Sequence, residues 1–382
     1  MYSISGYGQM IADERRMWAY STALRRAVSA DSIVLDIGAG TGILSLLACQ
    51  YGARKVYAVE PTSAIALAKE AACANGFADR MDCMQALSTE IRLPERADVI
   101  ISDLRGVLPL LQQHLPSIID ARCRLLAPGG NLIPKWDVLW AAVVEAPQQY
   151  DRLMKPWTQE RFGLNMQAAC QIVTNVWTKA RVTPHQLLTK PQCWATIDFL
   201  TTESADVSAT AHFEVVRPGL AHGFIVWFDS VLDDEIGFSN SPWEPEMIYG
   251  SAFFPWSSPV DLGFQDTVSI DLRADLVGSD YVWSWETCVH NRQDSRRSKA
   301  HFRQSTFLGA ALSPVQLRKR SSRYEPTLSD DGEIDLQVLQ LMDGTRSNEE
   351  IARVVAERFP SRFQSRRDVL TRITDLADKY SR

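Results

Sequence analysis

A glycine-rich segment between two apolar runs carries the residues whose types and spacing could do chemistry. It reads Asp-x-Gly-x-Gly-x-Gly, with Asp36 followed by Gly38, Gly40 and Gly42. Positions without a Cβ let backbone N–H groups and a helix N-terminus approach a polar ligand closely. Glu60 closes the second apolar run, where a carboxylate can accept hydrogen bonds from two ribose hydroxyls. The segment therefore predicts a site for a nucleotide-like ligand.

The spacing of the glycines indicates which ligand this is. A dinucleotide-binding turn reads G-x-G-x-x-G, but here Ile43 follows Gly42, and the chain has no G-x-x-x-x-G-K-[ST] phosphate loop. Asp-x-Gly-x-Gly-x-Gly with a later acidic strand end is instead the version for the methyl donor S-adenosylmethionine. We therefore expect a site for this donor, with an ordinary ligand-free turn as the alternative.

The elements that must position these residues alternate between strands and helices. Strands are expected at residues 32–37, 55–59, 82–86 and 98–102 and from Asn131 onward, and helices at 43–51, 63–75 and 108–126. This alternation predicts a parallel, doubly wound sheet, Rossmann-like, with helices on both faces. Ligands of such sheets lie at the carboxyl ends of the strands. Asp36, Glu60, the loop 88–90 and Asp103 should therefore surround one crevice.

A helix over residues 10–28 is expected before the first strand, with apolar residues along one stripe. Arg16 on this helix could clamp a ligand carboxylate with its planar guanidinium. The alternative is a solvated arginine on the polar face.

The character of the chain changes at Pro134. Short runs rich in β-branched and aromatic residues, separated by turn residues, predict an all-β second domain; they are residues 138–144, 193–200, 209–215, 223–229 and 267–272. From about Glu325 the pattern becomes helical, with helices at 333–342, from Ser347 to about Phe359, and at 366–380. Ser347 and Glu350 have the spacing of a capping box.

Bulk properties exclude several classes of protein. The 382 residues carry a net charge of −6, which argues against a nucleic-acid-coating surface. Seven cysteines without a C-x-x-C pair give neither a disulfide framework nor a zinc motif. No uncharged run reaches the roughly 18 residues of a membrane span, and the N-terminus lacks a signal-peptide pattern. The expected protein is cytoplasmic and does not bind membranes.

Several longer motifs resemble one family, the protein arginine methyltransferases, from Tyr7 to about Thr287. They are GYGQMIADERRM, VLDIGAGTGILSLLACQYGARKVYAVE, DVIISDLRG, LLAPGGNLIP and RFGLNM. The resemblance implies a Rossmann-like donor domain over residues 1–133 and a β-barrel substrate domain over 134–320. It also implies a homodimer formed through an arm at about 148–180.

The same resemblance implies roles for individual residues. Met10 would pack on the donor, Arg16 would bind its carboxylate, and Glu60 would hold the ribose hydroxyls. Asp36 and Gly38 would lie under the methionine part, and Glu90, or Thr89 beside it, would meet the adenine amino group. Tyr7, Gly40, Gly42 and Pro61 complete the expected donor-binding set.

The acceptor side departs from the family pattern of two glutamates nine residues apart. Asp103 and Gln112 stand at these positions and are the expected catalytic residues, so the carboxylate pair for a guanidinium is half present. Met247-Ile248-Tyr249 replaces the family's Thr-His-Trp loop. We expect an N-methyltransferase for an amine, imidazole or guanidine of a peptide or small molecule in a bacterial pathway. Methylation of a hydroxyl or carboxylate, and a non-catalytic scaffold, are the alternatives.

The C-terminal segment, residues 325–382, resembles small winged-helix, PqqD-like modules through Leu-x-x-x-Asp-Gly-Thr-Arg-x-x-x-Glu-Ile, which begins at Leu339. Such modules include domains that hold the leader segment of a peptide during its modification. The resemblance implies contact with a leader peptide, and the alternative is a structural cap on the β domain.

Overall fold

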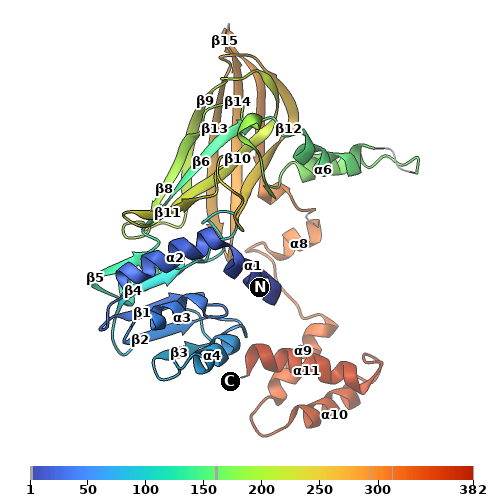
Figure 1. Ribbon diagram of the computed structural model, residues 1–382. Coiled ribbons are helices and arrows are strands. Elements are labelled where there is room, and N and C mark those ends of the chain that lie inside the picture. The colour runs from blue at the N-terminus through green and yellow to red at the C-terminus, as the bar shows by residue number, and fades with distance from the viewer. Residues whose placement is uncertain (1–2, 160–161, 293, 312, 382) are drawn as a thin grey trace. The chain divides into compact units, whose positions relative to one another are not determined.

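A computed structural model describes residues 3–159, 162–292, 294–311 and 313–381, without the side chains of 294–297. The chain divides into two compact units, Met1–Ala311 and Leu312–Arg382. The first unit holds a parallel sheet and two antiparallel sheets, and the second consists of helices (Figure 1).

The parallel sheet has the strand order β3-β2-β1-β4-β5. Its elements are β1 (Ile33–Ile37), α3 (Ile43–Gln50), β2 (Lys55–Val59), α4 (Ile65–Ala74), β3 (Met81–Met84), β4 (Ala97–Ser102), α5 (His114–Arg124) and β5 (Leu126–Ile133). All five residues of β1 are buried, as an apolar central strand requires. The order changes direction between β1 and β4, which leaves a crevice at their carboxyl ends. The expected Rossmann-like sheet is confirmed.

The prediction of one continuous helix over residues 10–28 is wrong. The chain forms α1 (Ile4–Ala12) and α2 (Glu14–Ala27), separated by Asp13 in an extended conformation. The Asp13 carboxylate accepts a hydrogen bond from the Arg16 backbone N–H, 3.1 Å, and so caps α2. Its other oxygen accepts from the Ile248 backbone N–H, 2.8 Å. A contact with a loop far along the chain therefore sets the break.

The helix expected over 108–126 is shorter, because α5 begins only at His114. Gln112 has φ +45° and interrupts any helix before that point. Residues 103–113 consequently form a loop that follows β4 and reaches over the crevice.

The strands after Pro134 form two antiparallel sheets. One has the order β7-β12-β10-β6-β8 with β11 on β10, and the other has the order β15-β14-β13-β9. The strands are β6 (Trp136–Val144), β7 (Thr178–Ala180), β8 (Gln192–Asp198), β9 (Val207–Glu214), β10 (Gly219–Asp233), β11 (Ile236–Ser239), β12 (Ser251–Leu262), β13 (Thr267–Val277), β14 (Asp280–Asn291) and β15 (Asp294–Ser305). All five strands expected in this region are present. Trp194, Trp256, Trp283 and Trp285 lie in the core.

The segment expected as an arm, 148–180, stands out beside the antiparallel sheets at α6 (Figure 1). It contains α6 (Pro147–Thr158), the 3-10 turn Gln167–Ala169, α7 (Cys170–Val173) and β7. Residues 160 and 161 within it lie outside the described part of the chain. Phe162 is 97% exposed, and Leu164 and Met166 are also exposed.

The second unit contains α8 (Pro314–Lys319), α9 (Asp330–Leu341), α10 (Asn348–Arg358) and α11 (Arg366–Tyr380). The capping box of Ser347 and Glu350 is present at the start of α10, as expected. Ile334, Val338, Ile351 and Val355 are buried between these helices. Within residues 313–381 the structure has helices and no strand, so the wing of a winged-helix module is not seen. Among the described residues, no helix combines the length and apolar character needed to cross a membrane.

Candidate active site

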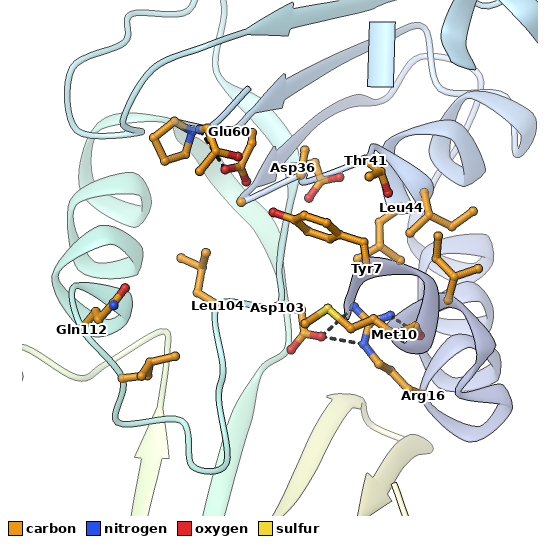
Figure 2. A pocket seen from close by; sticks show the side chains of 17 residues that line it. Tyr7, Met10, Arg16, Asp36, Thr41, Leu44, Glu60, Asp103, Leu104 and Gln112 are labelled. Atoms are coloured by element: carbon orange, nitrogen blue, oxygen red, sulfur yellow. Dashed lines mark hydrogen bonds and ion pairs between the residues drawn. The ribbon is translucent and has the colours of Figure 1, made fainter. Parts of the chain in front are cut away.

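A cavity of about 400 Å³ lies at the carboxyl ends of β1, β2 and β4, beneath α1 (Figure 2). It is lined by Tyr7, Met10, Ile11, Arg16, Asp36, Gly38, Ala39, Thr41, Ile43, Leu44, Glu60, Pro61, Thr62, Asp103, Leu104, Leu111 and Gln112. Its volume lies within the range of small-molecule sites, and its walls combine apolar side chains with a few charged groups.

The glycine turn and Glu60 form one side of this cavity. The Glu60 carboxylate is almost fully buried and accepts hydrogen bonds from the backbone N–H groups of Gly40, 3.1 Å, and Thr62, 3.0 Å. These two bonds fix the carboxylate at the end of β2. A Cβ on Gly40 would stand 2.4 Å from Cε1 of Tyr7, because the Tyr7 ring packs directly on the turn. Glycine at this position is therefore required by close packing as well as by its φ of +54°.

Asp36 lies at the floor of the cavity and is 1% exposed. Its Oδ2 accepts a hydrogen bond of 2.6 Å from the Ser45 hydroxyl. Burial raises the pKa of Asp36 to about 6, although the bond from Ser45 favours the charged form. Asp36 is therefore an uncompensated carboxylate at neutral pH, in a cavity that can receive a positive charge.

Arg16 and Asp103 form a buried ion pair on the opposite side of Tyr7 from Glu60 in Figure 2. Nε and one terminal nitrogen of Arg16 each lie 2.7 Å from Asp103 Oδ2, and the other terminal nitrogen donates to the Met10 carbonyl. The two side chains are only 5% and 8% exposed. Arg16 is thus held inside the protein by Asp103, and the alternative of a solvated arginine is wrong.

Asp103 has further partners from the antiparallel domain. The Tyr249 hydroxyl donates to the same Oδ2 at 2.8 Å, and Arg105 lies 3.7 Å from Oδ1. Burial alone would raise the pKa of Asp103, but the positive charges of Arg16 and Arg105 lower it below its usual value. Asp103 is therefore held ionised, which makes it a weak base but a strong hydrogen-bond acceptor.

Arg105 continues this network into the second domain. It makes two hydrogen bonds to Asp137, 3.0 and 2.7 Å, and further bonds to the hydroxyls of Tyr20, 2.8 Å, and Ser230, 2.9 Å. The Arg105 and Asp137 side chains are fully buried. Two arginines and two aspartates thus compensate one another between the parallel sheet and β6.

Gln112 borders the cavity across from Tyr7. It is exposed, and its φ of +45° is uncommon for a residue with a side chain. The loop after β4 therefore brings a neutral amide, and no second carboxylate, to this wall.

Most of the site residues predicted from the sequence line this cavity or shape the glycine turn beside it. Tyr7, Met10, Arg16, Asp36, Gly38, Glu60, Pro61, Asp103 and Gln112 line it. Gly40 and Gly42 shape the turn, since Gly42 packs on Ala68 of α4. The structure does not place Thr89 or Glu90 in the lining, and both are exposed. Leu87 and Ser88 instead line an adjoining cavity of about 160 Å³, together with His114.

The sequence placed Tyr249 in the segment that replaces the family's Thr-His-Trp loop but predicted no role for it, and it did not identify Arg105 or His114 as site residues. His114 is buried, and its Nδ1 donates to the Pro109 carbonyl at 2.6 Å. Burial, with the charge of Arg105, lowers the pKa of His114 to about 4, so the ring is neutral. The sequence held one indication for Arg105, because a charged residue three positions after a buried strand requires a partner if it is itself buried. Nothing local indicated that Asp137 and Tyr249 would supply such partners.

The strand order, the glycine turn and an acidic residue at the end of β2 together define the class of Rossmann-like methyltransferases. Two family models match the chain. One, described as ribosomal protein L11 methyltransferase, covers residues 21–134, and the other, the arginine methyltransferase oligomerization subdomain, covers 137–315.

Individual relatives agree with these matches. The chain is 32% identical over 257 residues to protein arginine N-methyltransferase 6 of Xenopus tropicalis, spanning 64% of this chain and 75% of that protein. It is 32% identical over 230 residues to the probable protein arginine N-methyltransferase 6 of Arabidopsis thaliana, spanning 58% of this chain and 53% of that protein. The chain belongs to the protein arginine N-methyltransferase family.

Solved structures show the same fold. Protein arginine methyltransferase 10 of Arabidopsis thaliana superposes with a TM-score of 0.69 at 23% identity, over 79% of this chain and 97% of that one. The Trypanosoma brucei PRMT1 enzyme–prozyme complex with AdoHcy gives a TM-score of 0.71 at 23% identity, over 78% and 96%. Both likenesses cover the parallel sheet together with the antiparallel domain.

Proposed function

We propose that this protein transfers a methyl group from S-adenosylmethionine to a nitrogen atom of a peptide or small molecule. The observation that carries the proposal is a single cavity that joins the glycine turn and Glu60 to Asp103 and Gln112. A donor held by the first pair of features would face an acceptor held by the second. Membership of the arginine methyltransferase family supports the same reaction class.

The donor would be held by residues of the parallel sheet and α1. Glu60 lies at the end of β2, where it can accept hydrogen bonds from ribose hydroxyls. Arg16 offers a guanidinium for the donor carboxylate, and Met10 an apolar cover. The adjoining cavity beside Leu87 and Ser88 is the better place for the adenine, since Thr89 and Glu90 do not line either cavity.

The donor supplies an electrophilic methyl group on a sulfonium. The protein has to align an acceptor lone pair with that methyl group and exclude water. Asp103 suits the orienting role, because it stays ionised and lines the cavity. We assign Asp103 to holding an acceptor N–H and offsetting the positive charge that develops on the nitrogen.

The acceptor wall favours a nitrogen group that needs only one carboxylate. A guanidinium is best bound by paired carboxylates in bidentate geometry. Here Asp103 Oδ2 already accepts two hydrogen bonds, from Arg16 Nε and the Tyr249 hydroxyl, and lies in an ion-pair contact with a second Arg16 nitrogen, and Gln112 adds a neutral amide. We therefore propose an amine or imidazole as well as the arginine side chain that names the family.

Glu60→Ala tests the donor site. Loss of hydrogen bonds to a charged acceptor should cost ~1.5–3 kcal/mol, or ten-fold or more in S-adenosylmethionine affinity measured by titration calorimetry. Glu90→Ala is the matched control, because Glu90 is exposed and lies outside the cavity. Equal affinities in the two variants would show that the donor site is elsewhere.

The competing functions give different results in the same experiments. A non-catalytic scaffold would show no donor binding at millimolar concentration. A transferase for carboxylates would yield a methyl ester that is lost in mild base, whereas an N-methyl product survives.

The second unit supports a peptide acceptor. Within it, α10 and α11 border a groove of about 560 Å³ lined by Phe359, Phe363 and Val369, with Arg353 and Arg366 at its margin. We propose that this groove holds a leader segment of the acceptor peptide. Phe363→Ala should then reduce turnover of a peptide while leaving turnover of a short amine unchanged.

A further inference from the structure

Three metal-binding side chains gather on the strand pair β14–β15. A carboxylate oxygen of Glu286, Sγ of Cys288 and a ring nitrogen of His301 all lie within 4.8 Å of one another. Cys288 stands directly opposite His301 in the antiparallel register, and Glu286 is two residues before Cys288. Side chains two apart on a strand share a face, so all three project from the same side of the sheet. Thr287 between them faces the core and is fully buried.

The donor set fits Zn²⁺ better than other common cations. A thiolate, an imidazole and a carboxylate are its usual ligands, and three of them leave a fourth position for water. Magnesium and calcium prefer oxygen ligands alone. Zinc bonds of 2.0–2.3 Å place neighbouring donor atoms about 3.5 Å apart, so side-chain rotation has to close roughly one ångström.

The contacts now made by these groups show what a metal would have to displace. His301 Nε2 lies 2.6 Å from Glu286 Oε1, and Arg303 Nε donates to the same oxygen at 3.0 Å. Arg303 stands opposite Glu286 in the register and competes with a cation for the carboxylate. Glu286 and His301 are 39% and 44% exposed, so an ion can reach them from solvent.

A hydrolytic Cys–His–acid arrangement is the other chemistry for these residues. Such a nucleophile requires a thiol with a lowered pKa. Burial and the neighbouring Glu286 instead raise the pKa of Cys288. The three donor atoms all lie within 4.8 Å of one another, so each can reach a single ion placed between them. This geometry supports metal binding.

We propose that Glu286, Cys288 and His301 bind one Zn²⁺ ion and so fasten β14 to β15. Binding forms one metal–sulfur, one metal–nitrogen and one metal–oxygen bond, and the thiol proton leaves to solvent. No other group of three such ligands occurs among the residues that the structure describes. The site is independent of the donor cavity and of the proposed methyl transfer.

Cobalt titration of the full-length, reduced protein tests the site directly, because Co²⁺ bound to a thiolate has a distinctive charge-transfer band. One equivalent should produce the band, and Zn²⁺ should abolish it by displacement. Cys288→Ser should remove the band, and His301→Asn should weaken binding at least ten-fold. Cys193→Ser is the control, since Cys193 is an exposed cysteine of β8 outside the cluster.

Arg303→Gln is expected to change cobalt affinity in the opposite direction to the ligand substitutions. Removal of the competing cation from Glu286 should tighten cobalt binding several-fold without adding a ligand. Thermal melting of each variant without metal shows whether it is folded. The proposal is overturned if the folded protein gives no thiolate band at one equivalent, or if the band survives in Cys288→Ser. Unchanged affinity in Arg303→Gln would also contradict it.

Discussion

At the scale of single residues, the site is governed by how its charges are compensated. Arg16 and Asp103 share one buried ion pair, while Asp36 has only the Ser45 hydroxyl as a polar side-chain partner. Neutralising one member of a buried ion pair lowers the free energy of unfolding, because the other charge is left buried without a partner. Neutralising a buried carboxylate that has no charged partner raises the free energy of unfolding, because the cost of burying the charge is removed. The two aspartates should therefore respond in opposite ways to the same substitution.

Asp36→Asn should stabilise the protein. The folded pKa of about 6 lies above the unfolded value near 4, so the folded state binds more protons between these pH values. Stability therefore falls as the pH rises from about 4 to 6 and stays low above that. The variant should gain about 2–3 kcal/mol at pH 8 in urea unfolding, and nothing at pH 4. A gain that does not vary with pH would contradict this reasoning.

Asp103→Asn should have the opposite effect on stability and should slow the reaction. Loss of the charge leaves Arg16 and Arg105 partly uncompensated, at a cost of roughly 3–5 kcal/mol. The lowered pKa of Asp103 means that its contribution is fully present at neutral pH and is lost only in acid, below about pH 4. Turnover should fall on the order of 10²-fold or more if Asp103 orients the acceptor.

Asp120→Asn is the control for Asp103, because Asp120 forms an exposed ion pair with Arg124 on α5. Normal turnover in a destabilised Asp103→Asn protein would assign Asp103 a structural role alone. That result would not affect the proposal for the donor site.

At the scale of elements, the joint between α1 and α2 positions the lid of the cavity. α1 supplies Tyr7 and Met10, and α2 supplies Arg16. Asp13 between them is bonded both to the first turn of α2 and to Ile248 of the antiparallel domain. The joint is thus held by the Asp13 side chain, together with the hydrogen bond from Arg16 of α2 to the Met10 carbonyl of α1.

Asp13→Ala should loosen this joint. Loss of a helix cap costs about 1–2 kcal/mol, and S-adenosylmethionine affinity should fall because Tyr7 and Met10 are less firmly placed. Asp13→Asn is the matched variant, since its side-chain oxygen can still cap α2 but its amide nitrogen cannot accept from Ile248. We expect an intermediate affinity in calorimetry. Equal affinity in all three proteins would exclude a role for the joint in donor binding.

At the scale of the first unit, two features matter: an ion pair that links distant parts of the chain, and an exposed surface on the arm. The Arg105–Asp137 pair ties the loop after β4 to β6 of the antiparallel domain. The arm carries the apolar residues Phe162, Leu164 and Met166, which are exposed. Exposed apolar clusters on an extension are typical of association surfaces, and the oligomerization-subdomain match covers this segment.

A homodimer formed through the arm is therefore predicted. Phe162→Ser combined with Leu164→Ser should shift the protein from dimer to monomer at micromolar concentration in light scattering. Val277→Ser is the control, because Val277 is an apolar residue at the end of β13 that is exposed to the same extent as Leu164, 62% against 61%. A monomeric wild type, or a dimer that both arm substitutions leave intact, would contradict the prediction.

The sequence by itself determined what depends on short spacing. The turn from Asp36 to Gly42, the acidic end of β2 and the capping box at Ser347 each involve residues within a few positions of one another. Local steric and hydrogen-bonding rules are sufficient to read them. The five apolar strands expected after Pro134 were identified for the same reason, because a run of β-branched and aromatic residues signals a buried strand locally.

Other elements lacked a local signal. β12 contains two prolines, Pro255 and Pro259, and β15 has a largely polar sequence, so neither shows the usual pattern. They form strands because β10 and β14 supply hydrogen-bonding partners along their length. Tertiary pairing overrides weak strand propensity in both.

Only the tertiary structure decided how the charges of the site are arranged. Asp103 meets Arg16 across 87 positions of the chain and Tyr249 across 146. Neither contact leaves a periodicity or motif in the sequence, because each depends on where three separate elements are packed. The sequence placed Asp103 on the acceptor side of the cavity, and the fold surrounded it with two arginines and a tyrosine. These neighbours lower its pKa, which is why we propose an orienting role for Asp103 instead of that of a base.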